Sequence, residues 1–384
     1  MKGVALVLTG AQVLRGDGFC DGALGIRDGR ITDATGVGSG PVRRLDLAGC
    51  LVLPGIVDIH GDGFERHLAP RRGAQRDLAA GLRATESELA ANGITTAHLA
   101  QFWSWEGGMR SPGFALALLA ALDGFRSLGT DMRVQLRLET HLLDDYTAFE
   151  AAVAAHGVRH VVFNDHLPHA ALTAGRRPPR LTGQALKSGR SPEAHLALLQ
   201  ALHGRSAAVP GALAGLAARL RARGVALGSH DDADAAARAE ARGMGVTLSE
   251  FPQTEAAARA ARAGGDAIVL GSPNVVRGGS HSGNVSARAL IDAGLCDALA
   301  SDYHYPAPLQ AALALGETIG LPRAWALVSG GPARLCGYAD RGRLGPGLRA
   351  DLVVLDPERR VCLTLAAGRV THAAGRGAEA LLAA

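Results

Sequence analysis

The feature that most constrains the fold is a regular alternation of apolar, strand-like runs with Ala-, Leu- and Arg-rich stretches across residues 51–340. Helices are expected at 76–91, 113–128, 193–203, 210–223, 233–242, 254–263, 286–293 and 308–318. Eight strand–helix pairs over roughly 290 residues are the number and size of a (β/α)₈ TIM-like barrel. The alternative is a doubly wound open sheet, which is weakened because the sequence contains neither GxGxxG nor GxxxxGK[ST].

Both ends of the chain have a different texture, in which short β-like pieces alternate with glycine turns. We therefore expect residues 1–50 and 341–384 to pair into one composite β-sandwich domain, beside a barrel domain of residues 51–340. Residues 170–192 form a long basic excursion from the barrel pattern. This excursion is predicted either to close over an active site or to be an insert without a function.

The composition limits the classes of molecule that the chain is expected to bind. The net charge is +4, and no basic run is dense enough to indicate nucleic-acid binding, so the excess fits scattered surface Arg or a small anionic substrate. Five widely spaced cysteines without a CxxC motif fit a reducing compartment. Neither a signal-peptide layout nor a membrane-spanning apolar run is found, so we expect a cytoplasmic location and no membrane partner. We separately expect a homodimer.

The apolar run at 51–62 ends in a histidine and a carboxylate two residues apart. Because side chains alternate along a strand, His60 and Asp62 point to the same side, where one metal ion could hold both. A lone His-x-Asp is more often a core histidine followed by a turn residue. Later strand ends repeat the pattern, however: we expect Glu139 at the fourth, His166 at the fifth, His230 at the sixth and Asp302 at the eighth.

Strand ends of a barrel converge on one face, so these side chains are predicted to form a single site. Imidazole and carboxylate ligands suit one or two divalent ions, namely Zn²⁺, Mn²⁺ or Fe²⁺. A bridging carboxylate could hold two ions that together activate water, with Asp302 both a ligand and the catalytic base. His141 and Asp165 are expected to orient the ligands through hydrogen bonds.

A glycine-rich segment at 271–284 follows the seventh expected strand. Its glycines permit a close approach of the backbone, and it offers hydrogen-bond donors for anionic oxygens from Arg277, Ser280, His281 and Asn284. Arg66, His67 and Arg71 add positive charge soon after the first metal pair. These residues are the predicted substrate contacts, although a plain glycine-rich connector and structural histidines are the alternatives.

Several motifs resemble a known family. PGIVDIHGD and GPARLCGYADRGRLGPGLRADLVVLD are similar to the amidohydrolase superfamily. HGDGFERHLAPR, GSHDDA, GSPNVVRGGSHSGNVSA and SDYHYPAPLQA resemble its phosphonate-metabolism branch, the amidohydrolases of the carbon–phosphorus lyase pathway. The resemblance implies hydrolysis of α-D-ribose 1-methylphosphonate 5-triphosphate to the 5-phosphate and pyrophosphate.

The resemblance also implies a ligand set. It comprises His60, Asp62, Glu139, His166, His230 and Asp302, with Asp62 in place of a second histidine and Glu139 in place of a carboxylated lysine. Two departures concern the substrate side: Gly63 stands where the branch has Asn, and the segment after His166 differs.

Two rival functions share these features. One is an amidase or deaminase acting on C–N bonds of a small anionic substrate, since fold does not fix chemistry. Arg66, Arg71 and Arg277 favour a polyphosphate over a neutral amide. The other rival is a non-catalytic ligand-binding barrel, against which the intact ligand set with Asp302 argues.

Overall fold

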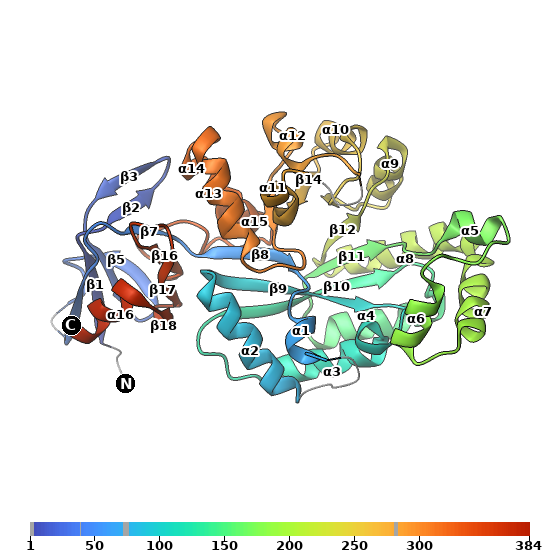
Figure 1. The fold of residues 1–384 in the computed structure, drawn as a ribbon, viewed down its shortest axis with the longest axis horizontal. Coiled ribbons are helices and arrows are strands. Elements are labelled where there is room, and N and C mark those ends of the chain that lie inside the picture. The colour runs from blue at the N-terminus through green and yellow to red at the C-terminus, as the bar shows by residue number, and fades with distance from the viewer. Residues whose placement is uncertain (1–3, 39, 72–76, 280–282) are drawn as a thin grey trace.

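Eight parallel strands form one sheet in chain order (Figure 1). They are β8 (Ile56–Gly61), β9 (Ile94–Trp103), β10 (Asp131–Glu139), β11 (His160–Asn164), β12 (Ala226–His230), β13 (Leu248–Glu250), β14 (Ala267–Gly271) and β15 (Ala298–Ala300). The computed structural model describes residues 4–38, 40–71, 77–279 and 283–384. The first and last strands meet at one end, where a parallel bridge joins Gly61 to Asp302. The predicted (β/α)₈ barrel is confirmed, in a nearly closed form.

The ligand-bearing strands come one place earlier than the sequence suggested. Only β9 lies between β8 and β10 in the sheet, so Glu139, at the end of β10, ends the third barrel strand rather than the fourth. His166 accordingly follows the fourth strand and His230 ends the fifth, whereas Asp302 follows the eighth as expected. The convergence at one end of the barrel is unaffected, because it depends on strand direction and not on strand number.

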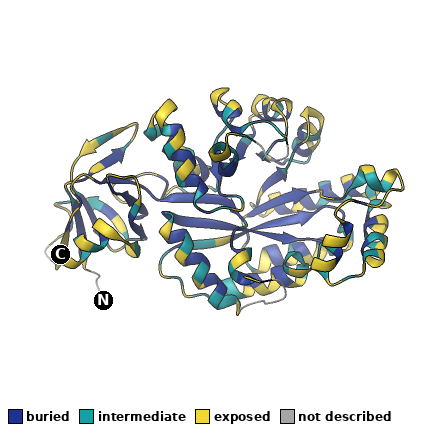
Figure 2. Cartoon of the chain, viewed as in Figure 1, coloured by how far each residue is buried: buried dark blue, intermediate teal, exposed yellow. Residues whose placement is uncertain are grey.

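Helices cover the outside of the barrel, and Figure 2 shows the strands as its buried layer. The larger ones are α2 (Leu78–Ala91), α3 (Pro112–Asp123), α4 (Tyr146–Ala155), α7 (Pro192–His203), α8 (Val209–Ala222), α9 (Ala235–Gly243), α10 (Glu255–Ala263) and α13 (Ala307–Ile319). Shorter ones are α1 (Glu65–Leu68), α11 (Ser272–Arg277), α12 (Ala287–Asp292), α14 (Leu321–Ala326) and α15 (Gly330–Leu335). Strands covered in this way read as continuous apolar runs because both of their faces are buried.

Local capping explains several helix starts. The side chains of Ser111, Ser191 and Thr254 each accept a hydrogen bond from a backbone amide in the first turn of α3, α7 and α10. Such caps satisfy amides that have no partner within the helix. These helices accordingly begin within two residues of the positions expected from the sequence.

The two ends of the chain build two further sheets. One has the order β5-β4-β1-β6, from β1 (Ala5–Thr9), β4 (Leu24–Arg27), β5 (Arg30–Asp33) and β6 (Val42–Asp46). The other has the order β18-β17-β16-β7-β2-β3, from β2 (Gln12–Arg15), β3 (Gly18–Asp21), β7 (Leu51–Pro54), β16 (Leu352–Leu355), β17 (Val361–Ala366) and β18 (Arg369–Ala373). The chain ends with α16 (Gly375–Ala383). Leu8 and Ile26 of the first sheet share one apolar cluster with Val52 and Val354 of the second.

The run 51–62, which reads as one strand in the sequence, is divided at Gly55. Its first half, β7, pairs antiparallel with β16, while its second half, β8, enters the barrel. A Cβ atom at Gly55 would lie 2.3 Å from Oγ1 of Thr95, so only glycine lets the chain pass this point without displacing β9. The division places β7 with the terminal sheets.

The basic excursion is folded. Residues 170–192 contain most of α5 (His169–Thr173) and all of α6 (Leu181–Ser188), and lead into α7. Leu181 packs with Trp105, Leu167, Leu199 and Leu202 in a small apolar cluster at the end of the barrel. The segment therefore has a fixed position over the strand ends, which is compatible with the predicted cover. Among the described helices, none is long and apolar enough to cross a membrane.

Candidate metal centre

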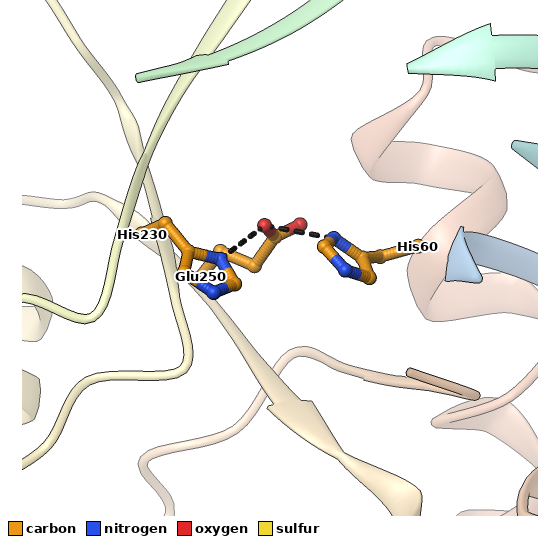
Figure 3. A group of neighbouring side chains, drawn as sticks. All are labelled: His60, His230 and Glu250. Atoms are coloured by element: carbon orange, nitrogen blue, oxygen red, sulfur yellow. Dashed lines mark hydrogen bonds and ion pairs between the residues drawn. The ribbon is translucent and has the colours of Figure 1, made fainter. Parts of the chain in front are cut away.

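Three side chains from three strand ends meet inside the barrel mouth. The Nδ1 atoms of His60 and His230 each lie 2.9 Å from Oε2 of Glu250 (Figure 3). The two imidazole rings are stacked, with centroids 5.5 Å apart and planes inclined by 16°. His60 is the next-to-last residue of β8, and His230 and Glu250 are the last residues of β12 and β13. The barrel brings them together because its strands end at one face.

The charges of this group depend on one another. Burial alone would raise the pKa of Glu250, but His60 and His230 hold it well below its usual range. For His60, burial favours the neutral form, yet the carboxylate of Glu250 raises the pKa above its ordinary value. Burial, followed by the positive charge of Arg137, lowers the pKa of His230 to about 4. The group thus holds an ionised carboxylate between two imidazoles.

The residues present fit a divalent metal. The buried Nδ1 of His60 has no partner in hydrogen-bonding geometry within the described part of the chain, although it faces a carboxylate oxygen at 2.9 Å. Donor atoms of all three residues lie within 4.8 Å of one another. Imidazole nitrogens and a carboxylate oxygen are the ligands that Zn²⁺ and related ions take in proteins.

Two further groups of possible ligands adjoin the first. His166, His230 and Asp231 form one, and Glu106, Glu139 and His166 form the other. Nδ1 of His166 lies 2.5 Å from Oε1 of Glu139, and its ring centroid is 6.0 Å from that of His230. Burial opposes ionisation of Glu139, but His166 lowers its pKa overall. Four of the predicted ligands, namely His60, Glu139, His166 and His230, are therefore neighbours.

Backbone hydrogen bonds of Asp62 and Asp302 join the end of β8 to the residues after β15 at the barrel mouth. The amide of Asp302 donates to the carbonyl of His60 at 2.9 Å, and the amide of Asp62 donates to the carbonyl of Asp302 at 2.8 Å. Burial raises the pKa of Asp302 to about 7; the charge of His60 opposes this rise and that of Asp62 adds to it. Neither carboxylate belongs to a metal-donor group found among the described residues. Their metal ligation therefore stays a prediction.

Sequence reasoning missed Glu250 and Arg137. Nη2 of Arg137 donates to Nε2 of His230 at 2.9 Å, and its Nη1 lies 3.5 Å from Nε2 of His60. The guanidinium is buried and also donates to Oδ1 of Asn164. A signal existed for both residues: Glu250 ends an expected strand, and Arg137 lies two residues before Glu139 and so shares its side of β10.

Only some of the predicted substrate contacts lie near this centre. Arg277 and Asn284 line a cavity of about 230 Å³ together with His230, Asp302 and Tyr303. Ser280 and His281 are outside the described residues.

Of the other predicted substrate contacts, two form ion pairs with a residue of α2 and one is exposed. Arg66 pairs with Glu88 of α2, and Nε2 of His67 lies 2.5 Å from the same carboxylate. Arg71 is exposed. At Gly63, an added Cβ would lie 3.1 Å from the Tyr305 ring, which gives a steric reason for glycine at this departure from the family motif.

A second cavity, of about 820 Å³, lies between the excursion and the barrel. His166 and Glu106 line it from the barrel side, while Arg180, Gln184 and Lys187 line it from the region of α6. Arg110 adds a third cation. The excursion therefore contributes positive charge beside a predicted metal ligand.

The fold is that of solved amidohydrolases. The chain is similar to the crystal structure of an amidohydrolase at 16% identity and a TM-score of 0.64, covering 96% of this chain and 98% of that one. It is also similar to an adenosine deaminase from Xanthomonas campestris with bound zinc, at 12% identity and a TM-score of 0.56, covering 99% and 96%. At such identities the likeness shows the fold alone. No family model matches the chain.

A relative of higher sequence identity shows the family to which the chain belongs. The α-D-ribose 1-methylphosphonate 5-triphosphate diphosphatase of Escherichia coli (strain K12) is 31% identical over 368 residues, which cover 91% of this chain and 94% of the relative. The chain belongs to this diphosphatase family and is a hydrolase, with the fold of the solved amidohydrolase. The resemblance that the motifs indicated is confirmed.

Proposed function

We propose that this hydrolase cleaves a phosphoanhydride of α-D-ribose 1-methylphosphonate 5-triphosphate, releasing pyrophosphate and the 5-phosphate during phosphonate catabolism. The observation that carries the proposal is the cavity beside the metal centre, where Asp302 and His230 share one space with Arg277 and Asn284. A group bound in this cavity would thus face a proton acceptor, a metal ligand and a cation. The family relative is named for this substrate.

The chain's own residues account for the chemistry. A divalent ion held by His60, His230 and Glu250, with Glu139 and His166 as adjoining donors, would polarise the phosphoryl oxygen and make water more acidic. Asp302 accepts the proton of the attacking water, a role suited to a carboxyl whose pKa burial raises to about 7. The water oxygen bonds to the α-phosphorus as the bond to the bridging oxygen breaks.

Positive charge stabilises the leaving pyrophosphate. Arg277 lines the cavity that contains Asp302, and Arg110, Arg180 and Lys187 line the larger cavity beside His166. Cations directed at a developing phosphate charge are the main catalytic element of phosphoryl transfer. We further propose that α6 covers the bound substrate and that the enzyme acts as a cytoplasmic homodimer.

A second candidate function is hydrolysis of a C–N bond. The fold likeness to an adenosine deaminase favours it, because the same barrel supports that reaction in another protein. The cations of the two cavities argue for the triphosphate instead, since a neutral amide makes no use of them. A non-catalytic barrel is a third possibility that the convergent ligands disfavour.

The reaction class is tested with metal-loaded protein and two substrate panels. Ribose and nucleoside 5-triphosphates are assayed for pyrophosphate, while cyclic amides and amino-substituted bases are assayed for ring opening and ammonia. We expect pyrophosphate and a 5-phosphate in equal amounts. Amide cleavage or ammonia release without pyrophosphate would replace the proposal by the second candidate, and a metal-loaded protein without any turnover would support the third.

A substitution of Arg277 tests the role of the cations in the smaller cavity. Arg277→Met should lower kcat as well as kcat/KM for the triphosphate, because Arg277 lines the cavity, belongs to no ligand group and is proposed to stabilise the leaving pyrophosphate. Arg288, a partly exposed residue of α12 that pairs with Asp292, offers the matched control in Arg288→Met. An equal kcat/KM for both variants would remove Arg277 from the substrate site.

A further inference from the structure

A second histidine–carboxylate cluster lies outside the candidate metal centre. His141 follows β10, Asp165 follows β11 and His169 begins α5, and donor atoms of the three lie within 4.8 Å of one another. His203, the last residue of α7, adjoins them. The cluster therefore joins two barrel strands to both ends of the α5–α7 segment.

The geometry of the cluster is close. Nε2 of His169 lies 2.9 Å from Oδ2 of Asp165, and its Nδ1 lies 2.8 Å from Nδ1 of His203. The ring centroid of His169 is 5.0 Å from that of His141 and 5.0 Å from that of His203. Two imidazoles thus approach one carboxylate, and a third adjoins them through His169.

The contact between His141 and Asp165 does not fit a hydrogen bond. Nδ1 of His141 lies 3.6 Å from Oδ1 of Asp165, which is beyond the range of a real bond. Two ligands at about 2.0–2.1 Å from a tetrahedral Zn²⁺ ion lie about 3.3 Å apart. The spacing is therefore closer to that of two donors to one ion than to that of a hydrogen-bonded pair.

The protein also holds His141 in place. Its side chain is 4% exposed, and its Nε2 hydrogen-bonds with Oγ of Ser206 at 3.1 Å. Metal-binding histidines usually have their second nitrogen fixed in this way, because the bond sets the ring orientation. Asp165 and His169 are 41% and 36% exposed, so an ion can reach the cluster from solvent.

We propose that His141, Asp165 and His169 form a second site for a divalent transition metal of the Zn²⁺ type, separate from the candidate catalytic centre. Water completes the coordination, and His203 positions His169 through its Nδ1 contact. An ion bound only by the folded chain stabilises the elements that carry its ligands. This ion fastens the α5–α7 segment, and with it the wall of the larger cavity, to the ends of β10 and β11.

The test counts metal ions in the full-length protein after Zn²⁺ loading and removal of free metal. We expect His169→Asn and Asp165→Asn each to lose about one ion per chain relative to the unaltered protein. His60→Asn should lose ions independently, so that the double variant with His169→Asn loses both. The control is His156→Asn, because His156 pairs with Asp123 at 2.6 Å but belongs to no donor group among the described residues.

A structural readout separates this site from the catalytic one. Zn²⁺ should slow amide hydrogen exchange in residues 169–203, which leave out His166, in the unaltered protein and in His60→Asn, but not in His169→Asn. Ser206→Ala should weaken Zn²⁺ binding at this site about 10–100-fold without abolishing it. Unchanged ion counts in both His169→Asn and Asp165→Asn would overturn the proposal, as would an equal loss in His156→Asn. Neither readout uses turnover, so the result stands whether or not the diphosphatase reaction is found.

Discussion

At the scale of single residues, hydrogen bonding decides which nitrogen of each imidazole faces the centre. His230 accepts a hydrogen bond from Arg137 at Nε2, so its Nδ1 is the atom that faces Glu250. Glu250 in turn accepts from Nε2 of Gln135 at 2.9 Å, which fixes the carboxylate between the two histidines. Arg137 and Glu250 thus set the orientation of the donors.

Glu250→Gln is expected to weaken Zn²⁺ binding at the centre at least about 10–100-fold, because it removes the charged oxygen that lies 2.9 Å from both imidazoles. Competition with a chromophoric chelator measures the affinity. The control is Glu255→Gln, which alters an exposed carboxylate at the start of α10. An unchanged Zn²⁺ affinity would show that Glu250 only orients the histidines.

Asp302→Asn is expected to lower turnover about 10²–10⁴-fold while most of the metal is retained, because the amide cannot accept the proton of water. Pyrophosphate release and metal content are measured on the same preparation. Asp292→Asn, at an exposed position on α12, is the control and should keep full turnover. Full activity in Asp302→Asn would end the assignment of Asp302 as the base.

At the scale of elements, an ion-pair cluster ties the start of β10 to the chain after α15. Nη1 of Arg341 donates to Oδ2 of Asp131 at 2.7 Å and to Oγ1 of Thr96 at 2.8 Å, and Arg133 pairs with the same carboxylate. Burial works against ionisation of Asp131, but Arg133 and Arg341 lower its pKa overall. The returning C-terminal segment is anchored to the barrel through this carboxylate.

Asp131→Asn should lower the free energy of unfolding by about 1–3 kcal/mol at pH 7, because Arg341, which is 6% exposed, loses a charged acceptor. The pKa of Asp131 is lower in the folded than in the unfolded chain, so its stabilisation is present above the unfolded value, about 3.9. It is lost as pH falls through the folded value. The difference between the two proteins in urea unfolding should therefore shrink below about pH 4.

The control for this measurement is Asp17→Asn, which changes an exposed aspartate in the N-terminal sheets. It should leave the free energy of unfolding at pH 7 within about 0.5 kcal/mol of that of the unaltered protein. A difference for Asp131→Asn that is constant from about pH 4 down to pH 3 would contradict the ion-pair explanation.

At the scale of the whole molecule, the terminal sheets pack on the barrel as one body. Nε1 of Trp325 donates to the carbonyl of Pro54 at 2.9 Å, and Oγ1 of Thr364 donates to the carbonyl of Ala90 at 2.8 Å. Gly93, between α2 and β9, approaches Val353 of β16 so closely that a Cβ there would lie 2.8 Å from Cγ2 of Val353. Barrel and sheets should therefore unfold together.

Gly93→Ala tests this junction. It is expected to lower the melting temperature of a single calorimetric transition, because it combines a left-handed backbone, φ +75°, with the contact to Val353. Gly265→Ala is the matched control: its φ is +77°, but nothing lies within 4 Å of the added atom. The control should show only the conformational cost of about 1–3 kcal/mol. Equal effects, or two separate transitions, would contradict the tight junction.

Much of the fold was predictable because local patterns are set by neighbouring residues. The alternation of apolar runs with Ala-, Leu- and Arg-rich stretches placed the helices from α2 to α13 within about five residues of their observed bounds, apart from α4, α5, α6 and α11. The rule that strand ends converge predicted that His60, Glu139, His166 and His230 would be neighbours. The family motifs then indicated the diphosphatase branch, which the relative confirms.

Only the tertiary structure decided which distant residues meet. Three features depend on contacts across the fold. β7 pairs with β16, and Arg66 and His67 form ion pairs with Glu88. Arg137 lies between two histidines. Glu250 was overlooked because one strand-end carboxylate looks like another until the barrel closes. Periodicity reports which side of an element is buried, whereas packing determines what lies opposite that side.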